Sequence, residues 1–277
     1  PTTINQTGGL SRVQNTRSLP NPATTTNGTI TPTRDQTQRR LTFVQAEPWL
    51  TRDKAMIDTL KSVGIEKGKP FTPDQRTEAI LRNAVEEAHA WLDQKYEEVF
   101  ASVFFDGARW AVPASREVIE GQQTFFADPG TYPVDGRGVS YSYAFFSAKH
   151  LGAGQFYLMT ITDKDGQPFH GTSTYRLTIP PDAPVSLYWS ATLYDRATHA
   201  LIREMPRSSR SSHAPDLQTN ADGSTDLYFA AQAPEGKAGN WVPTNRDGTF
   251  EVLVRFYGPK RPLFDKTWQL PHVTKLN

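Results

Sequence analysis

Strict alternation of apolar and polar side chains runs through the ten residues from Val185 to Tyr194. The apolar set is Leu187, Trp189, Ala191 and Leu193, and the polar set is Ser186, Tyr188, Ser190, Thr192 and Tyr194. Successive side chains of a strand point to opposite faces of its sheet, so this stretch predicts a strand with one buried and one polar face. We expect it to lie inside a two-layer antiparallel framework, with any chemistry on its polar face.

Five further stretches are rich in β-branched and aromatic residues and predict strands: 139–146, 155–162, 173–179, 224–229 and 250–257. Turn sequences separate most of them, including the D-K-D-G at 163–166 and the N-A-D-G at 220–223. A chain of many short strands with polar turns predicts a mostly β fold. We therefore expect an antiparallel β-sandwich or jelly roll in the C-terminal half, over residues 135–277.

A helical segment over residues 41–134 is expected before the β domain. The sequence T-P-D-Q at 72–75 places Thr72 as N-cap and Pro73 at the first helical position. The amphipathic helix that follows is predicted to end near Phe100. Its apolar stripe comprises Ile80, Leu81, Ala84, Val85, Ala88, Trp91, Leu92, Tyr96 and Val99. Shorter helices are expected over 51–62 and from Ser115, and the D-G-R-G at 135–138 predicts a turn.

Residues 1–40 differ from the rest of the chain because they contain no aromatic side chain and eleven threonines. Such a segment cannot bury enough apolar surface to offset the entropy lost on ordering. We expect an arm that is extended, loosely packed, or held by partner chains.

Composition excludes several kinds of function. The net charge of +1 at pH 7 argues against a nucleic-acid partner, and no run approaches the 18 apolar residues typical of a membrane span. With no cysteine and six scattered histidines, we expect neither a metal site nor a cofactor. The N-terminus has no apolar stretch typical of a signal peptide, so the chain is expected to be a processed product or never to have carried one.

Several motifs together resemble those of bacterial proteins of the domain-of-unknown-function families 1254 and 1214. They are F-V-Q-A-E-P-W-L at 43–50, G-I-E-K-G-K-P-F at 64–71, D-G-R-G-V-S-Y-S at 135–142, Y-W-S-A-T-L-Y-D at 188–195, N-A-D-G-S-T-D-L-Y-F at 220–229, N-W-V-P-T at 240–244 and F-D-K-T-W-Q-L-P at 264–271. The resemblance covers roughly 41–275. It implies two jelly-roll-like β domains joined by a helical segment, export to the periplasm, and a homo-oligomer.

In that family a whole β domain usually precedes the first of these motifs, where this chain has its forty Thr-rich residues. The resemblance therefore predicts either a fragment of a longer precursor or a truncation that retains the helical segment and the second domain.

One candidate site is the segment R-S-S-R-S-S at 207–212, which follows the central strand. The guanidinium groups of Arg207 and Arg210 and the serine hydroxyls match the oxygens of carboxylates, phosphates or sugars. The alternative is a solvated loop in which these arginines pair with Asp195 and Glu204.

A second candidate site is one face of the predicted sheet. Alternation along 250–257 places Glu251 and Arg255 on the same side, and Tyr188, Ser190 and Tyr194 of the central strand are expected to join them. With Asp226, these residues would form a groove suited to sugar binding or to a two-carboxylate glycosidase. The alternative is an exposed polar face crossed by ion pairs.

From these patterns we expect an exported, periplasmic or secreted protein that binds a polar, carbohydrate-like small molecule. Whether it is an enzyme stays open; a glycosidase-like hydrolase would use Asp195 or Glu251 as acid or base. Ligand contacts are expected from Arg207, Arg210, Tyr194, Trp241 and Arg255, with Trp241 stacking on the ligand. The alternative is a non-enzymatic subunit of an oligomer, assembled through the arm and the long helix.

Overall fold

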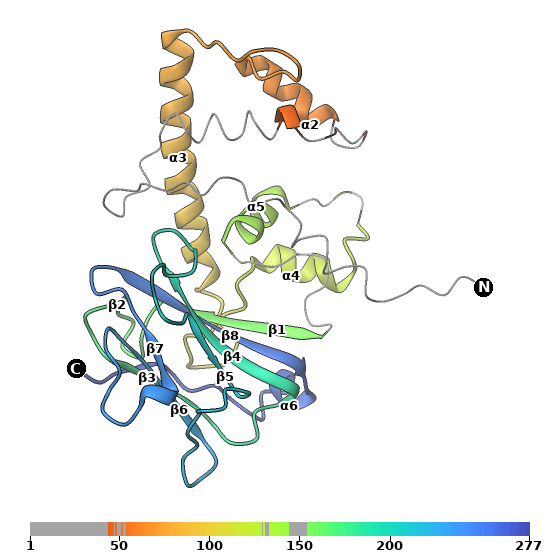
Figure 1. Cartoon of the computed structure of the whole chain (residues 1–277). Coiled ribbons are helices and arrows are strands. Elements are labelled where there is room, and N and C mark those ends of the chain that lie inside the picture. The colour runs from red at the N-terminus through yellow and green to blue at the C-terminus, as the bar shows by residue number, and fades with distance from the viewer. Residues whose placement is uncertain are drawn as a thin grey trace.

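The computed structural model describes residues 44–46, 48, 51, 54–128, 130, 133–143 and 154–277. The predicted arm, residues 1–40, lies outside the described residues. The helical elements are α2 (Lys54–Thr59), η2 (Leu60–Val63), α3 (Gln75–Val99), α4 (Arg116–Gln123) and α5 (Val134–Tyr143). In Figure 1, α3 stands on the β half of the molecule, with α2 near its far end and α4 and α5 beside its lower part.

Two sheets form the C-terminal half. Their strands are β1 (Gln155–Thr160), β2 (Phe169–His170), β3 (Tyr175–Ile179), β4 (Val185–Asp195), β5 (Ser209–Ser211), β6 (Thr225–Ala230), β7 (Trp241–Pro243), β8 (Thr249–Pro259) and β9 (Thr274–Lys275), with η3 (Ala238–Asn240) and α6 (Arg261–Phe264) between them. The first sheet has the order β1-β8-β4-β5, with β2 also on β8, and the second has the order β7-β6-β3-β9. Every pair is antiparallel except β6 with β7. The expected mostly β, sandwich-like fold is confirmed, as an open pair of sheets.

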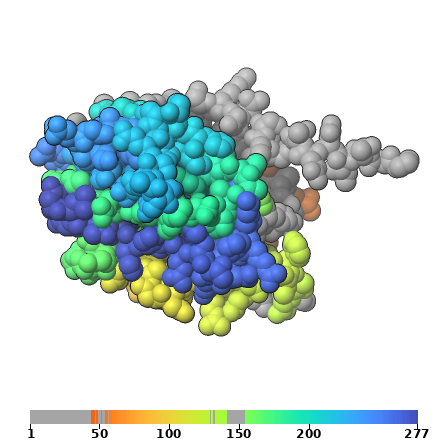
Figure 2. Space-filling view, turned by 90° about the horizontal axis from the view of Figure 1, so that it is seen from below, coloured from red at the N-terminus to blue at the C-terminus, as the bar shows by residue number. Residues whose placement is uncertain are grey.

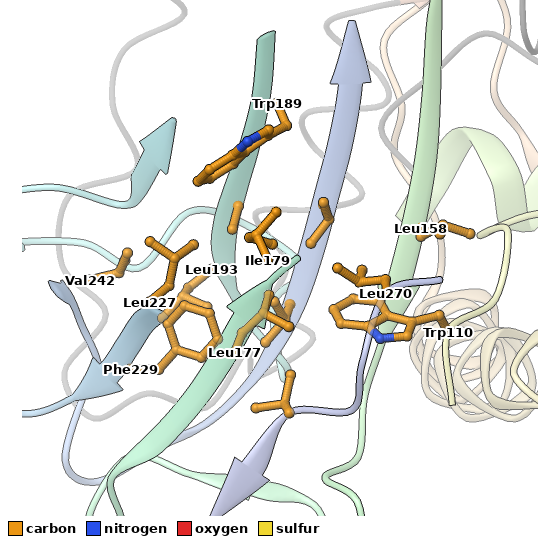
Figure 3. Close-up of a cluster of buried hydrophobic side chains, with 14 of the residues drawn as sticks. Trp110, Leu158, Leu177, Ile179, Trp189, Leu193, Leu227, Phe229, Val242 and Leu270 are labelled. Carbon is orange, nitrogen blue, oxygen red and sulfur yellow. The ribbon is translucent and has the colours of Figure 1, made fainter. Parts of the chain in front are cut away.

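The main core lies between the two sheets (Figure 3). Its members from the first sheet include Trp189, Ala191 and Leu193 of β4 and Phe250, Val252, Val254 and Phe256 of β8. From the second sheet come Tyr175, Leu177, Ile179, Leu227, Phe229 and Val242. The alternation read from the sequence therefore holds, with one exception. Leu187 is 64% exposed, because the register between β4 and β8 shifts between Val185 and Tyr188 and reverses the side-chain order there.

The segment that follows α3 belongs to this core. Trp110 is fully buried beside Leu270 and donates its indole N–H to the carbonyl of Pro271 at 2.8 Å (Figure 3). Phe105 is also fully buried there, and Ala111 bridges to Met159 of β1. Figure 2 shows this yellow segment against the blue C-terminal part of the chain. The core of the sandwich therefore includes residues that precede its first strand by about fifty positions.

The long helix begins two residues later than predicted. Asp74, rather than Thr72, is the N-cap, and its carboxylate accepts a hydrogen bond from the amide of Thr77 at 2.7 Å. A charged acceptor at this position also interacts favourably with the helix dipole. Only the C-terminal end of α3 is buried, through Tyr96 and Val99.

Residues 134–143 form α5, so the predicted turn at 135–138 and the described part of the predicted strand at 139–146 are wrong. Gly136 explains part of the difference. A Cβ on Gly136 would lie 2.3 Å from Oγ of Ser115. Because glycine has no Cβ, the first turn of α5 can approach α4 closely at this position. Over the described ranges, no helix is long and apolar enough to cross a membrane.

Candidate functional site

The outer face of the first sheet carries the residues predicted to gather around β4. In register, Arg255 of β8 lies between Tyr157 of β1 and Ser190 of β4. Tyr257 lies opposite Tyr188. We call this surface the arginine–tyrosine face; it comprises Tyr157, Tyr188, Ser190, Thr192, Tyr194, Arg255 and Tyr257.

Arg255 is half-buried at the centre of this face. Its Nη1 donates to Oγ1 of Thr192 at 2.9 Å, and its Nη2 donates to the hydroxyl of Tyr194 at 2.5 Å. The guanidinium carbon also lies 5.3 Å from the ring centroid of Tyr157. Among the residues that the structure describes, no carboxylate forms an ion pair with Arg255. The face therefore holds a partly desolvated positive charge whose contacts are hydroxyls and aromatic rings.

Two tyrosines of this face, Tyr157 and Tyr257, keep their protons at neutral pH. Burial raises the pKa of Tyr157, and it raises the pKa of Tyr257 to about 12, although Arg255 opposes the shift at both. Their hydroxyls can therefore donate hydrogen bonds as well as accept them.

An aromatic stack forms the edge of the face nearest to solvent. The rings of Tyr188 and Tyr257 are stacked with centroids 4.2 Å apart, and His213 lies 5.1 Å from Tyr188. Both tyrosines are half-buried and His213 is exposed. Flat aromatic surfaces beside hydrogen-bonding groups are typical of sites for small polar ligands.

At the opposite end the face is closed by α3. Glu251 is completely buried there; it accepts a hydrogen bond from the hydroxyl of Tyr96 at 2.9 Å, and its other carboxylate oxygen is hydrogen-bonded with Nδ1 of His199 at 3.1 Å. Burial raises the pKa of Glu251, while His199 and then Tyr96 act in the opposite direction. Nε2 of His199 in turn lies 3.5 Å from a carboxylate oxygen of Asp93. We call these residues, with Arg196, the buried polar cluster.

Arg196 connects the buried polar cluster to the surface of α3. It donates to Glu97 at 2.9 Å, lies 3.5 Å from Asp93, and covers the ring of Tyr96 at 5.2 Å. The roles of Asp93, Tyr96, Arg196 and His199 were not predicted from the sequence. Asp93, Tyr96 and Glu97 share one side of α3 at spacings of three and four residues, which is a weak signal of a shared contact surface. No pattern in the sequence indicates which distant residues they contact.

The two predicted catalytic carboxylates lie on opposite sides of the sheet. Asp195 is paired in register with Phe250, which faces the core, whereas Glu251 faces outward. The carboxylate of Asp195 accepts hydrogen bonds from the amide and the hydroxyl of Thr198, both at 2.8 Å. Asp226 is on the second sheet, where Thr178 donates to it, so its expected place beside Glu251 and Arg255 is wrong.

Arg207, Arg210 and Trp241 form a separate group at the edge of the sandwich. Arg210 is buried and ion-paired to Asp216, and its hydrogen bond lowers the pKa of that carboxyl. Arg207 lies 3.9 Å from Asp216 and donates to the carbonyl of Ala238. The guanidinium carbon of Arg207 lies 6.0 Å from the ring centroid of Trp241. The alternative pairing with Asp195 and Glu204 is therefore wrong, since Asp216 is the partner of both arginines.

Metal coordination finds no support in the described geometry. Within the described ranges, no group of three or more His, Asp or Glu side chains is arranged to hold a metal ion.

Comparison with protein families gives a match over part of the chain. Residues 154–261 match the family model described as "Protein of unknown function (DUF1214)". This confirms the 1214 part of the expected resemblance. The matched range contains β1 to β8 and therefore the whole arginine–tyrosine face. A comparison with curated proteins found no match.

Solved structures similar to this chain include two from other bacteria. The VPA0106 protein from Vibrio parahaemolyticus is 21% identical, with a TM-score of 0.42, over 81% of this chain and 51% of its own. An uncharacterized protein from Burkholderia cenocepacia is 19% identical, with a TM-score of 0.32, over 58% of this chain and 48% of its own. This chain thus spans about half the length of the solved structures it matches.

Proposed function

We propose that this protein binds a polar, carbohydrate-like small molecule that carries an acid group, and that it does so on the arginine–tyrosine face. The observation that carries the proposal is the half-buried guanidinium of Arg255, which bonds to Thr192 and Tyr194 without a carboxylate partner among the described residues. A charge removed from water is costly unless it is paired, so a ligand anion would stabilise this arrangement.

The surrounding side chains set the expected mode of binding. Arg255 would hold the acid group of the ligand, since guanidinium groups bind carboxylates with paired hydrogen bonds. The protonated hydroxyls of Tyr157 and Tyr257 would bind ring oxygens. The stacked rings of Tyr188 and Tyr257 would contact the apolar side of the sugar ring.

Calorimetric titration with D-glucuronate and with methyl glucoside tests the proposal. We expect glucuronate to bind more tightly, and Arg255→Met to weaken its binding roughly tenfold or more, as for loss of a charged hydrogen bond. Arg176→Met, on an exposed position of β3, is the matched control and should leave binding unchanged. Equal binding of both sugars, or no effect of Arg255→Met, would reject the proposal.

Hydrolysis of the ligand stays a prediction. The test is a screen against a glycoside library with Glu251→Gln and Asp195→Asn as variants. Turnover that is found in the native protein and lost in either variant would support an acid or base role for that residue. Unchanged turnover in both variants would reject those roles.

A second candidate function is that of an assembly subunit, and the exposed apolar residues of α3 favour it. Ile80 is 55% exposed and Trp91 38% exposed on the part of α3 that stands away from the sheets (Figure 1). Light scattering tests this function. The samples are the intact chain, a chain without residues 1–40, and the double variant Ile80→Glu with Trp91→Glu. A monomeric mass for the intact chain would reject it.

Two further parts of the proposal concern the whole protein. We infer that the residues from about 41 to 153 belong with the end of family 1254, and that the protein is exported to the periplasm. Cell fractionation of the native host tests the second inference, and recovery from the cytoplasmic fraction alone would contradict it.

A further inference from the structure

A cavity of about 790 Å³ lies on the other side of α3 from the buried polar cluster. Its walls come from the C-terminal end of α3, from α4 and α5, from Phe156 of β1 and from Phe264 of α6. The volume falls in the range of about 300–1,000 Å³ typical of small-molecule sites. None of the residues of the arginine–tyrosine face lines it, so it is a separate site.

The inner surface of this cavity is largely apolar. The lining includes Val99, Val103, Phe104, Ala114, Phe156 and Phe264. Three of the aromatic rings form a continuous row, with centroids 5.1 Å apart from Phe104 to Phe156 and again from Phe156 to Phe264. Val103 and Phe264 remain 41% and 43% exposed at the rim, so the cavity presents apolar surface to solvent.

The charged part of the lining has an excess of carboxylates. Lys95 pairs with Glu98 at 2.8 Å, and Arg116 pairs with Glu120 at 2.7 Å. Glu117 and Asp135 also line the cavity, and no ion pair neutralises either of them within the described part of the chain. The pKa of Lys95 is raised first by its hydrogen bond to Glu98, then by the charge of Glu98, and then by the charges of Asp135 and Glu117, so these groups lie within electrostatic range of one another.

The backbone positions of the two unneutralised carboxylates are fixed by the helices that carry them. Glu117 is in the first turn of α4, whose N-cap Ser115 accepts a hydrogen bond from Val118. Asp135 is in the first turn of α5, which Gly136 brings against Ser115. Helix dipoles account for an acid in a first turn. Helix dipoles do not explain why an apolar cavity opens between the carboxylates of Glu117 and Asp135 and the row of phenylalanine rings.

We propose that this cavity binds a small organic cation with an apolar body, such as an aromatic amine. The apolar body would pack against Phe104 and Phe156, and the cationic group would lie near Glu117 and Asp135. The exposed face of Phe264 adds favourable interaction with a positive charge. A neutral ligand of the same shape would gain only the apolar part of this interaction, and an anion would be repelled.

Three probes of similar size separate the contributions of shape and charge: 2-phenylethylamine, 2-phenylethanol and 3-phenylpropionate. Binding to the full chain is measured by calorimetry and by ligand-observed NMR. We expect the amine to bind most tightly and the carboxylate most weakly. Raising the salt concentration should weaken binding of the amine and leave that of the alcohol unchanged.

The double variant Glu117→Gln with Asp135→Asn tests the assigned carboxylates. Both positions are exposed, so folding should be unaffected, and the affinity for the amine should fall roughly three- to tenfold, as for two partly exposed charge pairs. Binding of the alcohol should not change. Glu86→Gln, an exposed acid of α3 that does not line the cavity, is the matched control.

Ala114→Phe provides a second test, because it places a ring inside the cavity and should abolish binding of the amine. Circular dichroism establishes that this variant folds. The proposal is overturned if the alcohol binds as tightly as the amine, if the double variant binds the amine unchanged, or if none of the three probes binds.

Discussion

Glu251 has no exposed surface, and both of its oxygens accept hydrogen bonds from residues far away in the sequence. Burial raises the pKa of the Glu251 carboxyl group above its ordinary value of 4.5. The folded protein therefore holds the carboxyl proton of Glu251 more tightly than the unfolded chain does. The stability that this proton contributes is present below about pH 4.5 and is lost as pH rises through the folded-state pKa. The ionisable groups facing Glu251 directly or through His199 are Tyr96, His199, Asp93 and Arg196.

Glu251→Gln removes this titration. The free energy of unfolding of the native protein, relative to that of the variant, should therefore fall as pH rises above 4.5, by about 1.4 kcal/mol for each unit by which the pKa is raised. Denaturant unfolding of both proteins between pH 4 and pH 8 measures the difference. A difference that is constant or grows with pH would contradict the prediction.

Tyr96 supplies one of the two donors to Glu251. Replacing it with Phe leaves a buried carboxyl oxygen without that donor, so we expect the free energy of unfolding to fall by about 1–3 kcal/mol. Tyr228→Phe on β6, a half-buried tyrosine whose ring contacts Lys237, is the control and should cost much less. Equal losses in the two variants would show that the bond to Glu251 contributes little.

At the scale of elements, the two glycines of α5 offer a comparison within one helix. A Cβ at Gly136 would lie 2.3 Å from Ser115 and 2.9 Å from Val118, whereas a Cβ at Gly138 would meet nothing within 4 Å. Alanine is favoured over glycine in a helix by about 1 kcal/mol at either position. Overpacking costs about 1–3 kcal/mol, which should exceed that gain at Gly136 only.

We therefore expect Gly138→Ala to raise the free energy of unfolding by up to about 1 kcal/mol. Gly136→Ala should lower it by about 1–2 kcal/mol and, by moving α4 away from α5, should alter the cavity between them. Thermal and denaturant unfolding of both variants measure the difference. If both substitutions stabilise the protein, the close contact with Ser115 is not rigid.

The same helix shows which elements sequence patterns can predict. Alternation gave both faces of β4 and β8, because burial on one side of a strand fixes which side chains point inward. For α5 the local signal was misleading. Asp135-Gly136-Arg137-Gly138 has the composition of a turn, and the close approach of Gly136 to Ser115, about twenty residues earlier, cannot be predicted from this local sequence.

The candidate sites divide in the same way. Strand parity was enough to place Arg255, Tyr188 and Tyr194 together, since they lie on neighbouring strands. Alternation along a strand could not place Asp226, because the sheet to which Asp226 belongs depends on the order of the strands. Nor could it reveal His199 beside Glu251, because that contact depends on a turn after β4 and on the docking of α3.

At the scale of the whole molecule, the sandwich is incomplete without the segment after α3. A chain limited to residues 154–277 would lack Trp110 and Phe105 from its core and Tyr96 from its outer face. Removing two large buried aromatic side chains costs about 3–5 kcal/mol each, which is comparable to the stability of a small domain. We expect this fragment to show no cooperative unfolding and a weak near-ultraviolet circular dichroism spectrum, in contrast to the intact chain.

Among the described residues of α3, only Tyr96 and Val99 near its C-terminal end are buried, which has a further consequence for the dynamics of this helix. Amide protons near Tyr96 and Val99 should exchange with deuterium only when the sandwich itself opens, whereas those near Gln75 need only local fraying. Mass spectrometry of deuterium uptake should therefore show a steady gradient along this single helix, fastest at its first turn. An external protease would follow that gradient, shortening the helix toward Leu92 while leaving the β half intact.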